Sequence, residues 1–212
     1  FGSNADDQAL TVTIGKDGLI YVGGDTRGSF DGQVNQGPVN ELDGYITAFD
    51  SSGVKKFTQF IGTEAPESVS GLEVSADGSL LISGSSGGEL SGQAQGNSFG
   101  GFLMNANATV SGLQTNWTKI FGNTMATESY ASAKSADGSM YMVGATNGAL
   151  NGANYSGNTD AYVTKMGADG TQQWTQLISS YEFNGSGDQV NGGQEVAYAV
   201  ATGADGSVYV SG

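Results

Sequence analysis

The sequence predicts an all-β protein in which four-stranded antiparallel units of about 60 residues follow one another. The main observation is a stretch that recurs four times: an apolar run, an Asp-Gly turn, and a second apolar run that ends in glycine. Composition agrees, because 36 of the 212 residues are glycine, two are proline, and no stretch shows helical periodicity. The four copies are Leu10–Gly24, Ser70–Gly84, Tyr130–Gly144 and Tyr198–Gly212.

Each copy is expected to form a β-hairpin around its Asp-Gly turn. Aspartate before glycine favours a turn for backbone reasons alone, and no Asp-x-Asp-x-Asp loop of the calcium-binding kind accompanies it. Beyond the turn, Ile20 and Val22 fall on one face of the predicted strand and Tyr21 on the other. Both faces are apolar, so this strand is expected to be covered on both sides. The turn aspartates are Asp17, Asp77, Asp137 and Asp205, at intervals of 60, 60 and 68 residues.

A glycine-rich connection follows the first three hairpins, with the pattern Gly-x-x-x-Gly-x-apolar-x-Gly. Glycines at this spacing permit positive φ and a tight path, so the apolar residue is predicted to anchor the loop. A phosphate-binding loop is disfavoured, because no strand-to-helix context surrounds the glycines. The predicted anchors are Phe30, Leu90 and Leu150.

A second hairpin completes each unit. In the first copy it comprises Gly44–Phe49 and Lys55–Phe60, and in the third Ala161–Met166 and Gln172–Leu177. The second copy, Gly101–Ile120, departs most from this pattern. Each unit is therefore expected to contain four antiparallel strands.

Four-stranded units with two buried faces favour a β-propeller segment, in which the units stack as blades around an axis. Tandem sandwiches need nearer ~100 residues per domain, and the coils of a β-solenoid are shorter. We predict a single propeller segment, 1–212. Its blades are the repeats 1–60, 61–120 and 121–177, followed by a partial repeat 178–212. Three and a half units would leave a ring incomplete, so we expect a part of a longer chain.

The third and fourth copies carry a recognisable pattern. It reads Asp-Ala-Tyr-Val-Thr-Lys at 160–165, Ala-Asp-Gly-Thr-Gln-Gln-Trp at 168–174, and Ala-Val-Ala…Asp-Gly-Ser-Val-Tyr-Val-Ser-Gly at 199–212. This pattern resembles the bacterial SBBP-type β-propeller repeats, and the likeness is weakest at 93–120. The resemblance implies a propeller within a large secreted or surface-displayed bacterial protein, and it brings no catalytic residue set.

Charge and residue usage restrict the function. The chain has 21 acidic and 7 basic residues, a net charge of −14, which disfavours nucleic acid and anionic membrane surfaces as partners. It contains neither cysteine nor histidine, which excludes a disulfide, a thiolate nucleophile, the usual zinc sites and a histidine general base. No run of 18 apolar residues occurs, so no membrane-spanning helix is predicted.

Two recurring residue types are interpreted as structural. An acid stands ten residues before the turn aspartate in three copies, and Glu128 lies one place out of register in the remaining one. Such a carboxylate can accept N–H bonds from a neighbouring loop, and a calcium site is the alternative. Aromatic residues at a fixed repeat position are expected to pack between blades rather than to bind sugars. The acids are Asp7, Glu67 and Glu195, and the aromatic residues are Phe57, Trp117 and Trp174.

The repeat is interrupted by about 11 extra residues in the fourth copy, Tyr181–Asn191. A long loop with aromatic and acidic residues on a rigid scaffold is a common site of recognition. The loop Gln33–Leu42, with Pro38 and Glu41, is a secondary candidate. The predicted partner-binding residues are Tyr181, Glu182, Phe183 and Asp188.

These observations predict a non-enzymatic, extracellular or cell-surface scaffold for structure, adhesion or binding to a protein or polysaccharide surface. No catalytic residue, metal ligand set or cofactor is predicted. A secreted acidic glycosidase-like hydrolase stays an alternative, with Glu182 and Asp188 as a carboxylate pair ~5–9.5 Å apart. A calcium-dependent surface-assembly module with a structural calcium ion is a further alternative.

Overall fold

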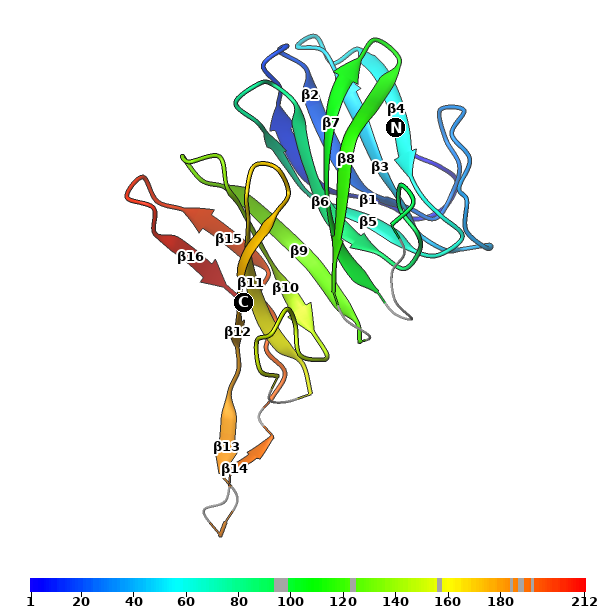
Figure 1. The fold of residues 1–212 in the computed structure, drawn as a ribbon. Helices are drawn as coiled ribbons and strands as arrows, with labels where there is room; N and C mark the ends of the chain where they lie inside the picture. The colour runs from blue at the N-terminus through cyan, green and yellow to red at the C-terminus, as the bar shows by residue number, and fades with distance from the viewer. Residues whose placement is uncertain (94–98, 123–124, 156–157, 184, 187–188, 192) are drawn as a thin grey trace.

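The described part of the chain folds entirely into β-strands, turns and connecting loops (Figure 1). Within it no helix is present, and so none that could cross a membrane. The prediction of an all-β chain is confirmed. The computed structural model describes residues 1–93, 99–122, 125–155, 158–183, 185–186, 189–191 and 193–212.

Each of the first three repeats forms a four-stranded antiparallel sheet, with its strands paired in chain order. The first sheet contains β1 (Asp7–Ile14), β2 (Ile20–Thr26), β3 (Asp43–Phe49) and β4 (Lys55–Ile61). The second contains β5 (Glu67–Val74), β6 (Leu80–Ser86), β7 (Gly100–Thr109) and β8 (Gly112–Phe121). The third contains β9 (Thr127–Lys134), β10 (Met140–Thr146), β11 (Asp160–Met166) and β12 (Gln172–Ile178).

Two further pairs of strands complete the described chain. The partial fourth repeat forms the hairpin of β15 (Ala199–Thr202) and β16 (Val208–Ser211). The inserted segment forms a short ribbon of β13 (Tyr181–Phe183) and β14 (Gln189–Asn191), which projects from the end of the third sheet (Figure 1). The insertion is therefore a paired ribbon, whereas the sequence predicted a loop.

The hairpins form where the sequence predicts them, and the turn aspartates act as turn residues. Asp77 Oδ1 accepts the backbone N–H of Ser79 at 2.9 Å, and Gly78 between them has φ of 94°. In the other three copies, too, the turn aspartate accepts the backbone N–H of the residue that follows the glycine. The divergent second copy also forms its second hairpin, β7–β8, whose strands have 10 residues each.

A β-bulge occurs in the first strand of each four-stranded sheet. The strand register shifts at Leu10 in β1, at Ser70 in β5 and at Tyr130 in β9. Opposite each bulge lies the glycine that ends the repeated stretch. A Cβ on Gly84 would come within 1.9 Å of the carbonyl oxygen of Ser68, so no other residue fits without a backbone shift. Gly24 and Gly144 are equally close to the strand they face.

The sheets stack through equivalent faces. We call the face that carries Ile20 and Val22 in the first sheet the leading face, and the face that carries Tyr21 the trailing face. Tyr21 packs in one core cluster with Leu80 and Ile82, so the trailing face of the first sheet meets the leading face of the second. The next two contacts repeat this pairing, through Leu81 with Met140 and Met142, and through Tyr141 with Val208 and Val210.

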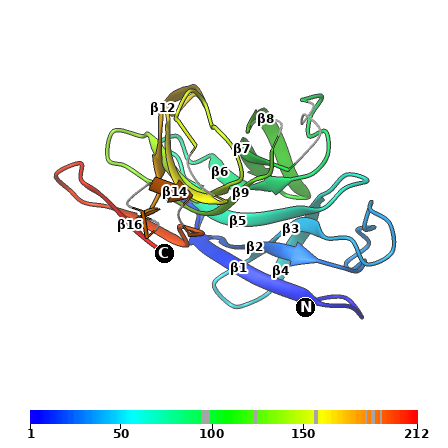
Figure 2. The same cartoon turned by 90° about the horizontal axis from the view of Figure 1, so that it is seen from below.

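The first strands of successive sheets lie next to one another. β1 contacts β5, β5 contacts β9, and β9 contacts β15. Seen from below, β1, β5 and β9 run side by side, and the outer strands β8 and β12 lie away from them (Figure 2). The sheets therefore fan out from a common inner row of strands.

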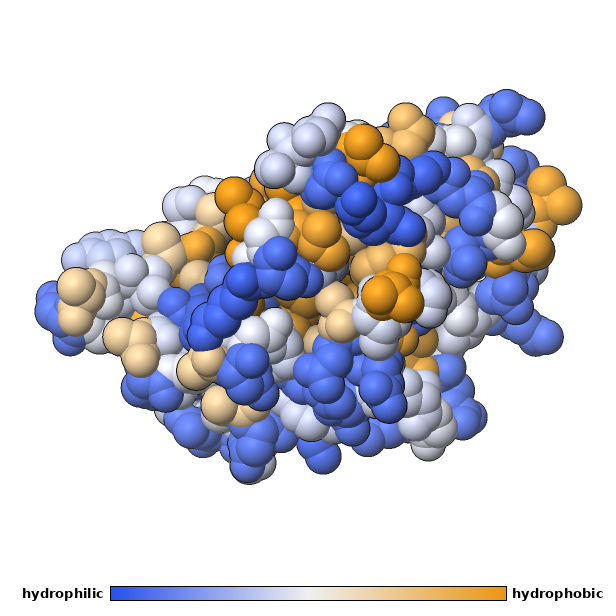
Figure 3. Space-filling model, turned by 90° about the horizontal axis from the view of Figure 1, so that it is seen from above, coloured by the Kyte–Doolittle hydropathy of each residue, from blue (hydrophilic) through white to orange (hydrophobic). Residues whose placement is uncertain are grey.

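The leading face of the first sheet is uncovered. Val12 and Ile14 of β1 are 65% and 68% exposed, whereas Leu72, the counterpart of Val12 in β5, is 4% exposed. Seen from above, the molecule carries hydrophobic residues interspersed with hydrophilic ones (Figure 3). An apolar surface of the kind that is buried between sheets is thus left exposed on the first sheet.

Two of the three recurrent aromatic residues pack as predicted. Phe57 lies in the cluster between the first and second sheets, and Trp117 packs against the cluster between the second and third. Trp174 differs, because it is 42% exposed and contacts Tyr141 of its own sheet at a ring-centroid distance of 5.8 Å. The next sheet in the stack is the two-stranded hairpin of β15 and β16, and it leaves Trp174 partly exposed.

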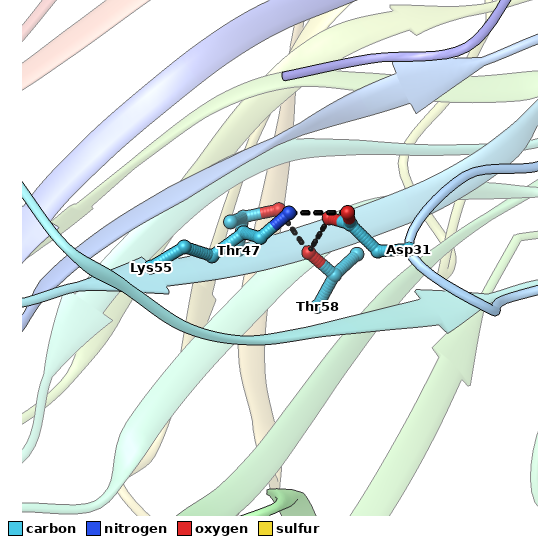
Figure 4. A network of polar contacts seen from close by, with 4 residues as sticks. All are labelled: Asp31, Thr47, Lys55 and Thr58. Carbon is cyan, nitrogen blue, oxygen red and sulfur yellow. Dashed lines mark hydrogen bonds and ion pairs between the residues drawn. The ribbon is translucent and has the colours of Figure 1, made fainter.

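The loop after each second strand is anchored as predicted. Phe30, Leu90 and Leu150 are buried, and each is followed by two residues with positive φ. In the first sheet the next residue, Asp31, accepts a hydrogen bond from Thr58 Oγ1 at 2.7 Å and forms an ion pair with Lys55 (Figure 4). Thr58 also bonds Thr47 at 2.9 Å, so this network connects the loop to β3 and β4.

The glycine opposite the bulge yields a first prediction. Replacing Gly84 with alanine should lower the free energy of unfolding by about 2 kcal/mol or more, because the new methyl group collides with backbone and not with a movable side chain. Urea unfolding followed by tryptophan fluorescence measures the effect. Gly185→Ala is the control, since a Cβ there meets nothing within 4 Å. Equal stability of the two variants would contradict the close approach.

The Asp31 network yields a second prediction. Partial burial alone would raise the pKa of Asp31, but the bonds from Lys55 and Thr58 outweigh it and lower the pKa. A lowered pKa in the folded state gives stability that is present above the unfolded pKa and is lost as pH falls through the folded one. Asp31→Asn should therefore cost about 0.5 kcal/mol at pH 7 and less below pH ~3.

Urea midpoints at the two pH values measure this difference. Glu89→Gln removes the same charge from an exposed position and is the control. The second and third sheets carry Ser91 and Asn151 at the position of Asp31, so a neutral residue is compatible with the loop. A cost that is the same at pH 7 and pH 3 would show that the ionised carboxylate does not contribute.

Candidate ligand cleft between the first strands

A cleft of about 630 Å³ lies along the inner row of first strands. Four of its lining residues occupy the same position in the four repeats: Leu10, Ser70, Tyr130 and Tyr198. The first three of these are the bulged residues of β1, β5 and β9. A bulge redirects the side chain of the extra residue, so the same backbone feature places one side chain from each sheet in the cleft.

Two tyrosines form an aromatic wall of the cleft. The rings of Tyr130 and Tyr198 lie 5.5 Å apart between centroids, inclined by 39°. The Tyr130 hydroxyl donates a hydrogen bond to Glu128 Oε2. Burial and this acceptor together raise the pKa of Tyr130, so the phenol stays neutral. Leu42, Pro66 and Phe99 add apolar surface to the lining.

The polar lining is predominantly acidic. Four carboxylates line the cleft: Asp25, Glu41, Glu67 and Glu128. Arg27 is the one basic residue among the described lining residues, and its guanidinium donates to the carbonyl of Asn40. The cleft therefore has an excess of negative charge.

Asp25 is the most unusual of these carboxylates. Its side chain is 6% exposed, and Oδ2 accepts a hydrogen bond from Ser68 at 2.8 Å. Oδ1 has no hydrogen-bond partner among the described residues. Burial raises the pKa of Asp25, and the bond from Ser68 and the charge of Arg27 oppose this only in part. The equivalent positions in the next two sheets hold Ser85 and Ala145, so the repeat does not require an acid there.

Glu67, by contrast, accepts hydrogen bonds from residues of its own repeat. It accepts the backbone N–H of Thr63 at 2.6 Å, and the hydroxyls of Thr63 and Ser86, each at 2.8 Å. Asp7 accepts the N–H of Ser3 at 2.6 Å in the same way. The prediction that these recurrent acids receive loop N–H groups is confirmed for both.

The third repeat explains why Glu128 is out of register. Thr127 takes the place of the recurrent acid, and its hydroxyl bonds that of Thr146 at 3.2 Å. Glu128 is therefore free to bond Tyr130 beside the cleft. In the fourth repeat Glu195 accepts a hydrogen bond from Ser180. Across the described residues no group of three or more acids is placed to hold a metal ion.

The residues predicted to bind partners lie elsewhere. The structure places Tyr181, Glu182 and Phe183 on β13, away from the cleft, and Asp188 lies outside the described residues. By contrast, the secondary candidate, the loop Gln33–Leu42, contributes Glu41 to the lining of the cleft. Sequence reasoning missed Asp25 and Tyr130. The available signal was an acid at a position that holds serine and alanine in the next two copies, and a tyrosine at a position that holds leucine and serine in the first two.

Comparison with known proteins gives a partial likeness. No family model matches the chain. The regulatory protein FlaEY of Caulobacter vibrioides is 38% identical over 88 residues, which is 40% of this chain and 9% of that protein. The match therefore spans a small fraction of a much longer relative.

The uncompensated carboxylate yields a third prediction. Asp25→Ser should raise the free energy of unfolding by about 1 kcal/mol at pH 7, because it removes a buried oxygen without a hydrogen-bond donor. A carboxyl whose folded pKa is raised costs stability above that pKa, so the gain should shrink as pH falls through it. Thermal unfolding between pH 3 and pH 7 measures both effects. Lower stability of the variant at pH 7 would contradict the assignment.

Proposed function

We propose that this chain is a segment of a β-propeller of the SBBP-type repeat class and serves as a non-catalytic, extracellular binding scaffold. The observation that carries the proposal is the repeated contact between trailing and leading faces. Three successive contacts use equivalent residues, as expected of blades related by one constant rotation. The inner row of first strands is the arrangement that blades adopt around an axis.

The uncovered leading face supports continuation of the array. Val12 and Ile14 occupy positions whose counterparts in the second sheet pack against the sheet before it. We propose that a further sheet of the same repeat covers this face in the functional assembly. Continuity with the three existing contacts is the argument for that occupant.

A binding role is supported by the cleft and by charge. The cleft lies on the inner strands, where four repeats contribute one side chain each. A net charge of −14 suits a solvated protein that attracts cationic partners. The likeness to part of a protein named for a regulatory role is compatible with binding and assigns no chemistry to this chain.

Thiol labelling tests the scaffold proposal. These 212 residues contain no cysteine, so within them a single introduced one reports on its own site. Val12→Cys should be protected from a membrane-impermeant maleimide on intact cells that produce the protein, and should react rapidly in the isolated 212-residue chain. Val110→Cys is the matched control, because Val110 is 98% exposed at the tip of the β7–β8 hairpin.

The control should react in both settings. Protection of both sites on intact cells would overturn the extracellular placement. Equal reaction of both sites on intact cells would overturn the covering of the leading face by a further sheet.

A further inference from the structure

The cleft contains an unused acceptor. Asp25 is more than nine-tenths buried, lines the cleft, and has an oxygen with no partner in the described structure. Leaving such an acceptor without a donor costs free energy, and the equivalent positions of the next two sheets hold Ser85 and Ala145, which lack the carboxylate. A position that departs from its own repeat at a cost in stability indicates a role outside the scaffold.

The surroundings of Asp25 define the chemistry that would fit. Glu41 and Glu128 add negative charge, so the missing donor should be cationic. Tyr130 and Tyr198 present aromatic rings, which attract a cation placed over their faces. Leu42 and Phe99 supply apolar surface for an aliphatic stem.

We propose that the cleft binds an organic cation, a guanidinium or ammonium group on an apolar stem, with Asp25 as its principal hydrogen-bond acceptor. The group binds between the tyrosine pair and the acids, and its stem lies against Leu42 and Phe99. The proposal names the ligand class of the binding scaffold proposed above and rests on that binding role.

Other ligand classes fit the lining less well. An anion would meet four carboxylates and one arginine that already donates to Asn40. A calcium ion takes six to eight oxygen ligands, whereas no group of three acids in the described chain is placed to hold a metal ion. A cleft of about 630 Å³ is large enough for one extended side chain with its neighbouring backbone.

The same cation can come from a free amine or from a basic side chain of a partner protein. Isothermal titration of the 212-residue chain with three probes separates them: spermidine, N-acetyl-arginine amide, and a ten-residue Arg-Gly peptide. N-acetyl-citrulline amide is the neutral isostere. We expect saturable binding of the arginine probe, none of the citrulline probe, and weaker binding at higher ionic strength. Tighter binding of the peptide would identify a protein partner, and tighter binding of spermidine a free amine.

Variants locate the site. Asp25→Ser should fold, since Ser85 occupies the same place in the second sheet, and should weaken binding of the arginine probe by about tenfold or more. Tyr198→Ala changes an exposed ring and should weaken it by about threefold to tenfold. Glu89→Gln removes one negative charge outside the cleft and should leave binding unchanged.

Three outcomes would overturn the assignment. They are equal binding of the citrulline probe, equal losses in Asp25→Ser and Glu89→Gln, and stoichiometric binding of calcium or of a polysaccharide with no response to the arginine probe. None of them bears on the thiol-labelling result, so failure of the ligand assignment is distinguishable from failure of the scaffold proposal.

Discussion

The close approach of a glycine to the first strand of its sheet is the contact on which the rest of the structure depends. At Gly24, Gly84 and Gly144 the facing carbonyl occupies the space of a side chain, and the bulge in the opposite strand lies beside it. The bulge sets which side chain leaves the plane of the sheet. One backbone contact therefore keeps both faces of the second strand in register for stacking and directs a residue into the cleft.

Much of this arrangement could be predicted from the sequence. The period-2 pattern of Ile20, Tyr21 and Val22 predicts a strand with two buried faces, and such strands must lie inside a stack. The anchor Phe30 and the Asp-Gly turns follow from local chemistry that operates over a few residues. The angle between neighbouring sheets does not follow, because it depends on how side chains from different sheets interdigitate.

The candidate site was harder to predict for a related reason. Asp25 stands in a short Gly-Gly-Asp-Thr run that resembles a strand end, and its special character arises only when Ser68 of the next sheet and Arg27 surround it. In the sequence Tyr130 looks like one more apolar strand residue. In the structure the bulge in β9 directs its side chain into the cleft. The insertion is visible in the sequence because it breaks the repeat, whereas the cleft is built from positions that keep the repeat and differ only in the residue they hold.

That distribution of residues has an evolutionary consequence. Leu10, Ser70, Tyr130 and Tyr198 occupy one structural position in four tandem copies, yet they differ in size and polarity. Each copy can exchange this residue without altering the backbone of its neighbours, since the closely approaching glycine is present in all four copies. Duplication of the repeat therefore supplies a row of independently mutable positions on a conserved frame, and new binding specificities can arise by substitution in a single copy.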